Sequence, residues 1–295
     1  MRIAFLGLGA IGRPMAVRVA ERHPTVLWNR TTERAAELAR ETGARLAETP
    51  RDAVTDADVV MTCLPTSAEV ESLLEGPDGL IAGMRKDALL ADCTSGDPAS
   101  SRRIAARLAR EGIAFVDAPV SGGTNGAEAG TLTVMVGGTE ADYERARPAL
   151  AAFGRTIVHM GPVGTGHAMK SVNNALLAVN ILAVAEGIAA LVKAGVSART
   201  ALEVLNVSSG RSFVSETLVP ERVLTGAFPD TFRLALLQKD AGIAAQLLRD
   251  TGVEGPMLEL AYRLYGEARR TLGENADYLE AIRVIERQAG VEIRG

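Results

Sequence analysis

A glycine-rich turn near the start of the chain constrains the fold more than any other feature. The turn, Gly7 to Gly12, follows the apolar run 3–6 and precedes a stretch, 13–20, with helical periodicity. In a G-x-G-x-x-G turn, the first glycine permits the tight turn, the second lets a pyrophosphate approach the backbone, and the third lets the helix pack close to the strand. A second strand pattern follows at 25–28, so the segment predicts a dinucleotide-binding unit. The predicted cofactor-binding residues here are Gly7, Leu8, Gly9, Ala10, Ile11 and Gly12.

The end of the second strand bears on which dinucleotide is bound. An acidic residue about 20 positions after the glycines accepts a hydrogen bond from the ribose 2′-hydroxyl of NAD. This chain has Asn29, Arg30 and Thr31 there instead. Asn29 can tolerate a 2′-phosphate, Arg30 can pair with it, and Thr31 can donate a hydrogen bond to it. The segment therefore favours NADP, with NAD still possible. The alternative is that 29–32 merely caps the next helix, predicted at 32–42, with Arg30 in solvent.

Strand and helix patterns alternate from residue 1 to about residue 120, which predicts a doubly wound parallel sheet of the Rossmann type. Further strands are expected at 57–64, 88–93 and 113–118, and two more, 131–137 and 156–160, extend the sheet; helices are expected at 67–74 and 100–111. Ligands bind beyond the carboxyl ends of such strands. Leu64, Pro65 and Ser95 occupy these ends.

A second glycine turn, Ser121-Gly122-Gly123, follows the strand 113–118. It offers a hydroxyl and unshielded backbone amides, an arrangement that can bind a carboxylate. The alternative is a flexible hinge after the strand. His159 is interpreted as structural, because no Ser, Cys or carboxylate cluster accompanies it in the sequence.

The run 161–166 is rich in glycine and predicts a domain boundary, giving a dinucleotide-binding domain at 1–163 and an all-helical domain at 164–295. The helical domain opens with a long apolar helix, 166–194, that carries Lys170 and Asn174 on one face. Lys170 either faces a polar cleft or merely reaches solvent along its stem. Further helices are expected at 198–205, 215–224, 235–251, 257–272 and 278–289.

Composition excludes several classes of function. The net charge of −4 argues against nucleic-acid binding as the main role, and no metal-ligand spacing is present. The most membrane-like run, 175–185, is interrupted by Asn180 and closed by Glu186, so a membrane span is not expected. The chain starts directly in a strand pattern, and Cys63 and Cys93 suit small buried positions in a reducing compartment, so a cytoplasmic location is expected.

Four blocks of the chain resemble the β-hydroxyacid dehydrogenase family, most closely the 3-hydroxyisobutyrate dehydrogenases within it. The blocks are 7–16, 117–124, 166–174 and 239–240, and together they span nearly the whole length. The resemblance implies that Lys170 is the catalytic lysine and that Asn174 orients the substrate. It further implies that Ser121, Gly122 and Gly123 bind the substrate carboxylate, and that Lys239 lies near the nicotinamide.

The resemblance also extends to contacts of Leu64, Pro65 and Ser95 with the cofactor. Departures from the family pattern are modest: Ile11 replaces a usual Met, Thr94-Ser95 replaces Ser-Thr, and Glu69 stands where some members have an Asn.

The implied activity is hydride transfer between NADP or NAD and a small β-hydroxy acid or its semialdehyde, in a homodimer or homotetramer. Tartronate semialdehyde, succinic semialdehyde and glyoxylate are alternative substrates to 3-hydroxyisobutyrate. Imine reductases have a similar scaffold but usually lack the lysine, and a non-catalytic nucleotide-binding relative would tend to lose it as well.

Overall fold

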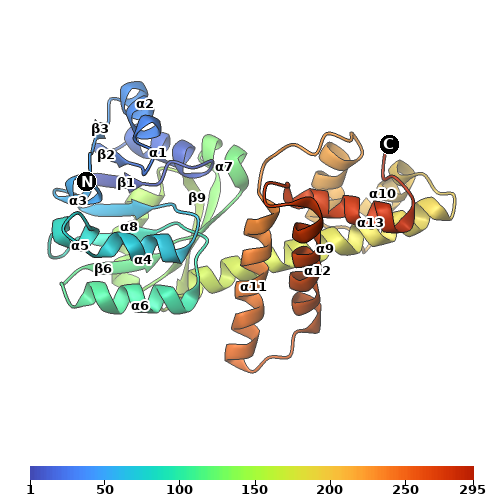
Figure 1. Ribbon diagram of the computed structural model, residues 1–295. Coiled ribbons are helices and arrows are strands. Elements are labelled where there is room, and N and C mark those ends of the chain that lie inside the picture. Colours follow the sequence, from blue (N-terminus) through green and yellow to red (C-terminus); the bar gives the residue numbers. More distant parts are fainter. The chain divides into compact units, whose positions relative to one another are not determined.

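The computed structural model describes residues 1–295, which form two compact units, Met1–Lys170 and Ser171–Gly295. In Figure 1 the first unit runs from blue to green and the second from yellow to red. One long helix, α9 (Thr165–Lys193), is continuous through the division between them. Its first residue lies just beyond the domain boundary expected at 163.

The first unit contains a nine-stranded sheet in the order β3-β2-β1-β4-β5-β6-β8-β7, with β9 paired to β8. The strands are β1 (Ile3–Leu6), β2 (Thr25–Trp28), β3 (Arg45–Leu46), β4 (Val59–Thr62), β5 (Leu89–Asp92), β6 (Ala114–Asp117), β7 (Val120–Ser121), β8 (Leu132–Gly137) and β9 (Gly154–Gly161). From β3 to β6 all neighbours are parallel, which confirms the doubly wound Rossmann prediction.

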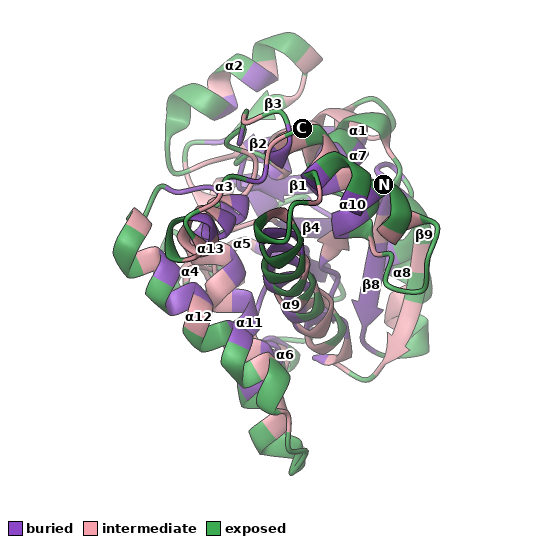
Figure 2. Ribbon diagram, turned by 90° about the vertical axis from the view of Figure 1, so that its right-hand side faces the viewer, coloured by how far each residue is buried: buried purple, intermediate pink, exposed green.

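The two strands expected to extend the sheet do so as β8 and β9, and β8 runs antiparallel to β6 and β7, a direction that the sequence did not predict. Between β6 and β8 the chain forms β7 and the short helix α7 (Gly123–Ala129), whereas the parallel pair β8 and β9 is separated by the longer helix α8 (Glu140–Leu150). Alternation in the sequence reports which faces are buried and not the direction of a strand. Figure 2 shows β8 buried and β9 only partly buried.

Helices cover both faces of the sheet, and successive residues of a strand pack against helices on opposite faces. Ile3 and Phe5 of β1 pack in one hydrophobic cluster, while Ala4 and Leu6 pack in another on the opposite face. The first cluster takes buried residues from α1 (Gly12–Ala20), α2 (Thr32–Thr42), α7 and α8. The second takes them from α3 (Pro50–Val54), α4 (Ser67–Leu74), α5 (Leu80–Gly83) and α6 (Pro98–Ala109).

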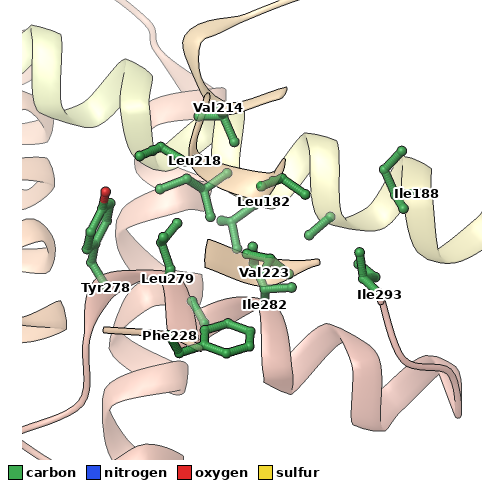
Figure 3. Close-up of a cluster of buried hydrophobic side chains, with 14 of the residues drawn as sticks. Leu182, Ile188, Val214, Leu218, Val223, Phe228, Tyr278, Leu279, Ile282 and Ile293 are labelled. Carbon is green, nitrogen blue, oxygen red and sulfur yellow. The ribbon is translucent and has the colours of Figure 1, made fainter. Parts of the chain in front are cut away.

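The second unit is helical, as expected, and has a core of its own. After α9 come α10 (Ala198–Asn206), η1 (Val214–Val223), α11 (Leu234–Thr251), α12 (Pro256–Leu272), η2 (Tyr278–Glu280) and α13 (Ala281–Ala289). Figure 3 shows Leu182 and Ile188 of α9 with the core residues of η1 and α13. Two expectations need correction: η1 is a π-helix, and the segment expected to start a helix at 278 opens with a 3₁₀ turn.

Helix α9 is long and apolar enough to cross a membrane by length and composition, since it has 29 residues and contains an 18-residue stretch with a mean hydropathy of 2.2. The expectation that this helix does not span a membrane therefore stays a prediction. Length and hydropathy do not separate a membrane span from the core helix of a globular domain. Ala178, Ile181 and Ala185 of α9 are buried in the core of the second unit, so packing accounts for these apolar residues.

Candidate active site

The glycine turn after β1 has the shape of a phosphate cradle. A Cβ on Gly7 would collide with the carbonyl oxygen of Cys63, and one on Gly12 with that of Gly7, whereas Gly9 is exposed and has nothing within 4 Å of that position. No side chain caps the first turn of α1. The turn therefore closes tightly on itself and leaves its middle open, which fits a pyrophosphate at the helix N-terminus.

Asn29 ties this turn to the end of β2. Its side-chain oxygen accepts a hydrogen bond from the backbone N–H of Leu8 at 2.9 Å, and its amide nitrogen donates to the Thr31 carbonyl at 2.9 Å. Arg30 and Thr31 are exposed beside the first turn of α2, which also has no side-chain cap. This end of the sheet thus presents a guanidinium and an uncapped helix N-terminus, both of which favour an anion.

The sheet order aligns the predicted cofactor and substrate residues along one edge. Reading across β2, β1, β4, β5 and β6, the chain places Asn29, the glycine turn, Leu64, Ser95 and Ser121 at the carboxyl ends. Four strand spacings cover roughly 19 Å. Pro65, next to Leu64, is exposed, and the Leu64 N–H donates to the Thr94 hydroxyl at 3.1 Å, which joins β4 to β5. The arrangement matches an extended ligand that ends near β6.

The turn after β6 has an unusual backbone. Gly122 and Gly123 have φ values of +132° and +66°, which L side chains rarely adopt, and both are exposed. Ser121 ends β7, and Gly123 begins α7. These amides and the Ser121 hydroxyl therefore lie at the end of the row, as the carboxylate-binding prediction requires.

The same end of the sheet holds the first turn of α9. The carboxylate of Asp117, the last residue of β6, accepts hydrogen bonds from the N–H groups of Gly164 at 2.6 Å and His167 at 2.8 Å. Lys170 follows one turn later and is half-buried. The strand that leads to the carboxylate turn thus also anchors the helix that carries the predicted catalytic lysine.

Asn174 is held rigidly within the second unit. Its amide nitrogen donates to Asp240 at 2.6 Å, and its oxygen accepts from Asn173 at 3.0 Å. Asp240 is 1% exposed and also pairs with Lys239, with 3.0 Å between Nζ and Oδ1. The sequence prediction assigned a role to Lys239 but missed Asp240, which fixes the orientation of the Asn174 amide. The adjacent pair Lys239-Asp240 was the only available signal.

The distribution of lysine supports a chemical role for Lys170. The chain has 28 arginines and only four lysines, at positions 86, 170, 193 and 239. Arginine does not release its proton in proteins, whereas a lysine can exchange one. Two of the four lysines stand in the predicted site, and the other two are exposed. Lys170 is thus one of few cationic side chains in the chain that can exchange a proton.

Other reactive side chains lie outside this arrangement. Burial raises the pKa of the Cys63 thiol to about 12 and raises that of Cys93 well above its ordinary value, so both thiols stay protonated. The His159 side chain contacts the Gly138 carbonyl at 2.9 Å and stacks on Tyr143, which agrees with a structural role. No group of three His, Cys, Asp or Glu side chains is placed to hold a metal ion.

Comparison with known proteins covers the whole chain. Residues 2–161 match the NAD-binding domain of 6-phosphogluconate dehydrogenase, and residues 164–285 match the NAD-binding domain of NADP-dependent 3-hydroxyisobutyrate dehydrogenase. A 2-(hydroxymethyl)glutarate dehydrogenase of Eubacterium barkeri is 36% identical over 296 residues, covering 100% of this chain and 98% of the relative. An NAD-dependent L-serine dehydrogenase of Pseudomonas aeruginosa is 39% identical over 90% of this chain and 91% of its own length.

A solved structure agrees with these matches. The 3-hydroxyisobutyrate dehydrogenase of Mycobacterium tuberculosis, described with L-serine, superimposes with a TM-score of 0.88 at 32% identity and covers 96% of this chain and 98% of its own. This match spans nearly all of the chain, including most of both units.

Proposed function

The chain belongs to the β-hydroxyacid dehydrogenase family, and from this premise we propose that it oxidises 3-hydroxyisobutyrate with NADP. The proposal is carried by two features that occur in the same chain: an open glycine cradle after β1, and Lys170 and Asn174 one turn apart on α9. Nicotinamide supplies the hydride acceptor, and the chain supplies the proton acceptor.

The names of the relatives narrow the substrate class. 3-Hydroxyisobutyrate, L-serine and 2-(hydroxymethyl)glutarate are all 3-hydroxypropionates with a substituent at C2, namely methyl, amino and carboxyethyl. Their shared part is a carboxylate two carbons from a primary alcohol. We infer that the turn 121–123 binds the carboxylate of this shared part. The substituent at C2 then determines which of these substrates each relative accepts.

The proposed reaction needs three actions from the chain. The Ser121 hydroxyl and the amides of Gly122 and Gly123 hold the carboxylate, and Asn174 donates to the substrate hydroxyl with the N–H not used by Asp240. Lys170 as a neutral amine takes the hydroxyl proton while the carbon gives up hydride, leaving an aldehyde; the ammonium form returns the proton in reduction. A proton-transfer group of this kind is worth ~10²- to 10⁴-fold in rate.

The NADP preference rests on charge at the β2 end of the sheet. Arg30 and the uncapped start of α2 supply positive potential where NAD enzymes place a carboxylate. A change of Arg30→Ala should raise the KM for NADP and leave that for NAD unchanged. The exposed Arg110, at the C-terminal end of α6, offers a matched control, since Arg110→Ala removes the same charge elsewhere.

We also propose a homodimer or homotetramer in the cytoplasm. Leu176 and Leu191 of α9 are 49% and 41% exposed, and Val253 and Met257, between and at the start of neighbouring helices, are 54% and 60% exposed. Apolar side chains of this size at these positions suit burial against a second copy. Light scattering after size exclusion would give the number of subunits.

The deciding experiment is steady-state oxidation of a substrate panel with NADP and NAD side by side. The panel contains both enantiomers of 3-hydroxyisobutyrate, L-serine, 2-(hydroxymethyl)glutarate and D-glycerate, with 4-hydroxybutyrate as the compound whose alcohol lies one carbon further from the carboxylate. We expect turnover of 3-hydroxyisobutyrate with NADP and little of 4-hydroxybutyrate. Failure to oxidise any member, together with failure to reduce the matching semialdehydes and glyoxylate, would refute the proposal.

A further inference from the structure

Beneath the first turn of α9 lies a cluster of four buried polar side chains that the proposed reaction does not use. Asp92 ends β5, Asp117 ends β6, Ser101 lies on α6, and His167 lies in the first turn of α9. All four are fully shielded from solvent. Burying polar groups costs free energy unless each has a hydrogen-bond or charge partner. The burial of these four side chains therefore depends on the partners of each.

The two carboxylates stand next to each other, because Asp92 and Asp117 are paired in the register of β5 and β6. Asp117 is compensated by the N–H groups of Gly164 and His167, one on each oxygen. Burial raises the pKa of Asp117, and the charge of His167 and these N–H groups act in the opposite direction. His167 is thus the residue that contacts Asp117 through its backbone and faces Asp92 through its ring.

Asp92 is compensated on one side only. Its Oδ1 accepts from the Thr62 hydroxyl at 2.9 Å and from the Thr94 N–H at 3.1 Å. Its Oδ2 has no hydrogen-bond partner, and neither does His167 Nε2, which lies 4.0 Å away. That separation is too long for a direct hydrogen bond, so the two atoms face each other at the end of β5 in a place without solvent.

The other side of the ring is fixed by contact. His167 Nδ1 lies 2.6 Å from the Ser101 hydroxyl, and a Cβ on Gly96 would come within 2.6 Å of the ring carbon Cε1. Serine, histidine and aspartate together suggest a hydrolytic triad, but the geometry excludes one. The Ser101 hydroxyl is fully buried and also lies 3.1 Å from the Asp97 carbonyl, so no substrate can reach it.

We propose that His167 is a positioning residue for Lys170, which follows it by three residues on the same helix. The ring is hydrogen-bonded to Ser101 and faces Asp92, and the backbone N–H donates to Asp117. Side chains of α6, β5 and β6 thus surround the first turn of α9 and fix where it begins. The inference deepens the proposed function and rests on it for the catalytic readout. Its structural readout stands without it.

The catalytic test compares His167→Phe with His167→Gln. Phe fills the space but loses both polar contacts, and a misplacement of about 1 Å at a reacting group costs about 100-fold in rate. We expect kcat to fall by about that factor while the Kd of NADP stays unchanged. Gln can extend an N–H toward Asp92 and should recover part of the loss. The matched control is His159→Phe, which removes a histidine of β9 that contacts the Gly138 carbonyl and not α9.

Equal losses in cofactor affinity and kcat would indicate general damage to the fold and would overturn the proposal. So would full kcat in His167→Phe. Ser101→Ala is the milder variant, since it removes one hydroxyl beside the ring; we expect a smaller loss of kcat there, and the same kcat as wild type in both Ser101→Ala and His167→Gln would also overturn it.

The structural readout uses the scarcity of lysine. Reductive methylation with ¹³C-formaldehyde labels four lysines and the N-terminal amine, so each gives a resolvable NMR signal, and Lys170→Arg identifies that of Lys170. His167→Phe should shift or broaden the Lys170 signal and leave those of Lys86 and Lys193 unchanged. An unchanged Lys170 signal would refute the positioning role. An inactive wild type would refute the proposed function while leaving this measurement valid.

Discussion

Proton exchange distinguishes Lys170 from an arginine at the same position. Replacing it by Arg keeps the charge but not the ability to accept a proton, so Lys170→Arg and Lys170→Ala should both lower kcat by ~10²- to 10⁴-fold. Cofactor affinity, measured by fluorescence titration with NADPH, should change little. Lys193→Arg on the same helix is the control. Near-normal turnover by Lys170→Arg would mean that the residue supplies charge alone.

Asp240 has a different task, because it orients a neighbour. Its Oδ2 accepts from Asn174 and its Oδ1 pairs with Lys239, so it determines which way the amide of Asn174 points. Asp240→Asn keeps the size but can turn a second amide toward Asn174, and we expect a loss of kcat of about 10-fold or more. In the double variant with Asn174→Ala the two losses should not add. Additive losses would show that Asp240 acts independently of Asn174.

At the scale of elements, Gly12 and Gly9 of the same glycine turn should respond differently to substitution by alanine. Gly12→Ala places a methyl group against the Gly7 carbonyl and should destabilise the first unit by more than ~1 kcal/mol. Gly9→Ala meets no atom of the protein, so its melting temperature should match wild type while the Kd for NADP rises. Thermal melts and cofactor titrations on both variants check this. If Gly9→Ala bound NADP as tightly as wild type, the pyrophosphate would not approach the backbone at Gly9.

Local patterns explain how much of this could be predicted from sequence. The strands that lead to Gly7, Leu64 and Ser95, and the long helix that follows Gly164, could be predicted because their apolar periodicity is strong. Asp240, His167 and Asp92 were not, because their roles depend on partners far away in the sequence that a single chain does not identify. A helix was predicted at 215–224, but not that it is a π-helix, because apolar spacing indicates which residues are buried and not which backbone groups are hydrogen-bonded.

At the scale of the whole molecule, the chain has separate hydrophobic cores in its two units. The clusters on the two faces of the sheet and the cluster of the helical unit share no buried residue. Since the open glycine turn belongs to the first unit, cofactor binding should stabilise that unit directly. At about 100 times its Kd, NADP adds about 2.7 kcal/mol to the free energy of any opening that disrupts the cofactor site.

Hydrogen exchange measured by mass spectrometry can follow the two cores separately. We expect NADP to slow the exchange of the most protected amides in β1 and β4 by about 100-fold, because their opening must release the cofactor. Amides of α10 and α13, which pack in the helical core, should slow much less. NAD at the same multiple of its own Kd is the matched control for occupancy. Equal slowing in both cores would mean that the chain opens as one cooperative body through α9, and the two-unit description would then hold for packing but not for stability.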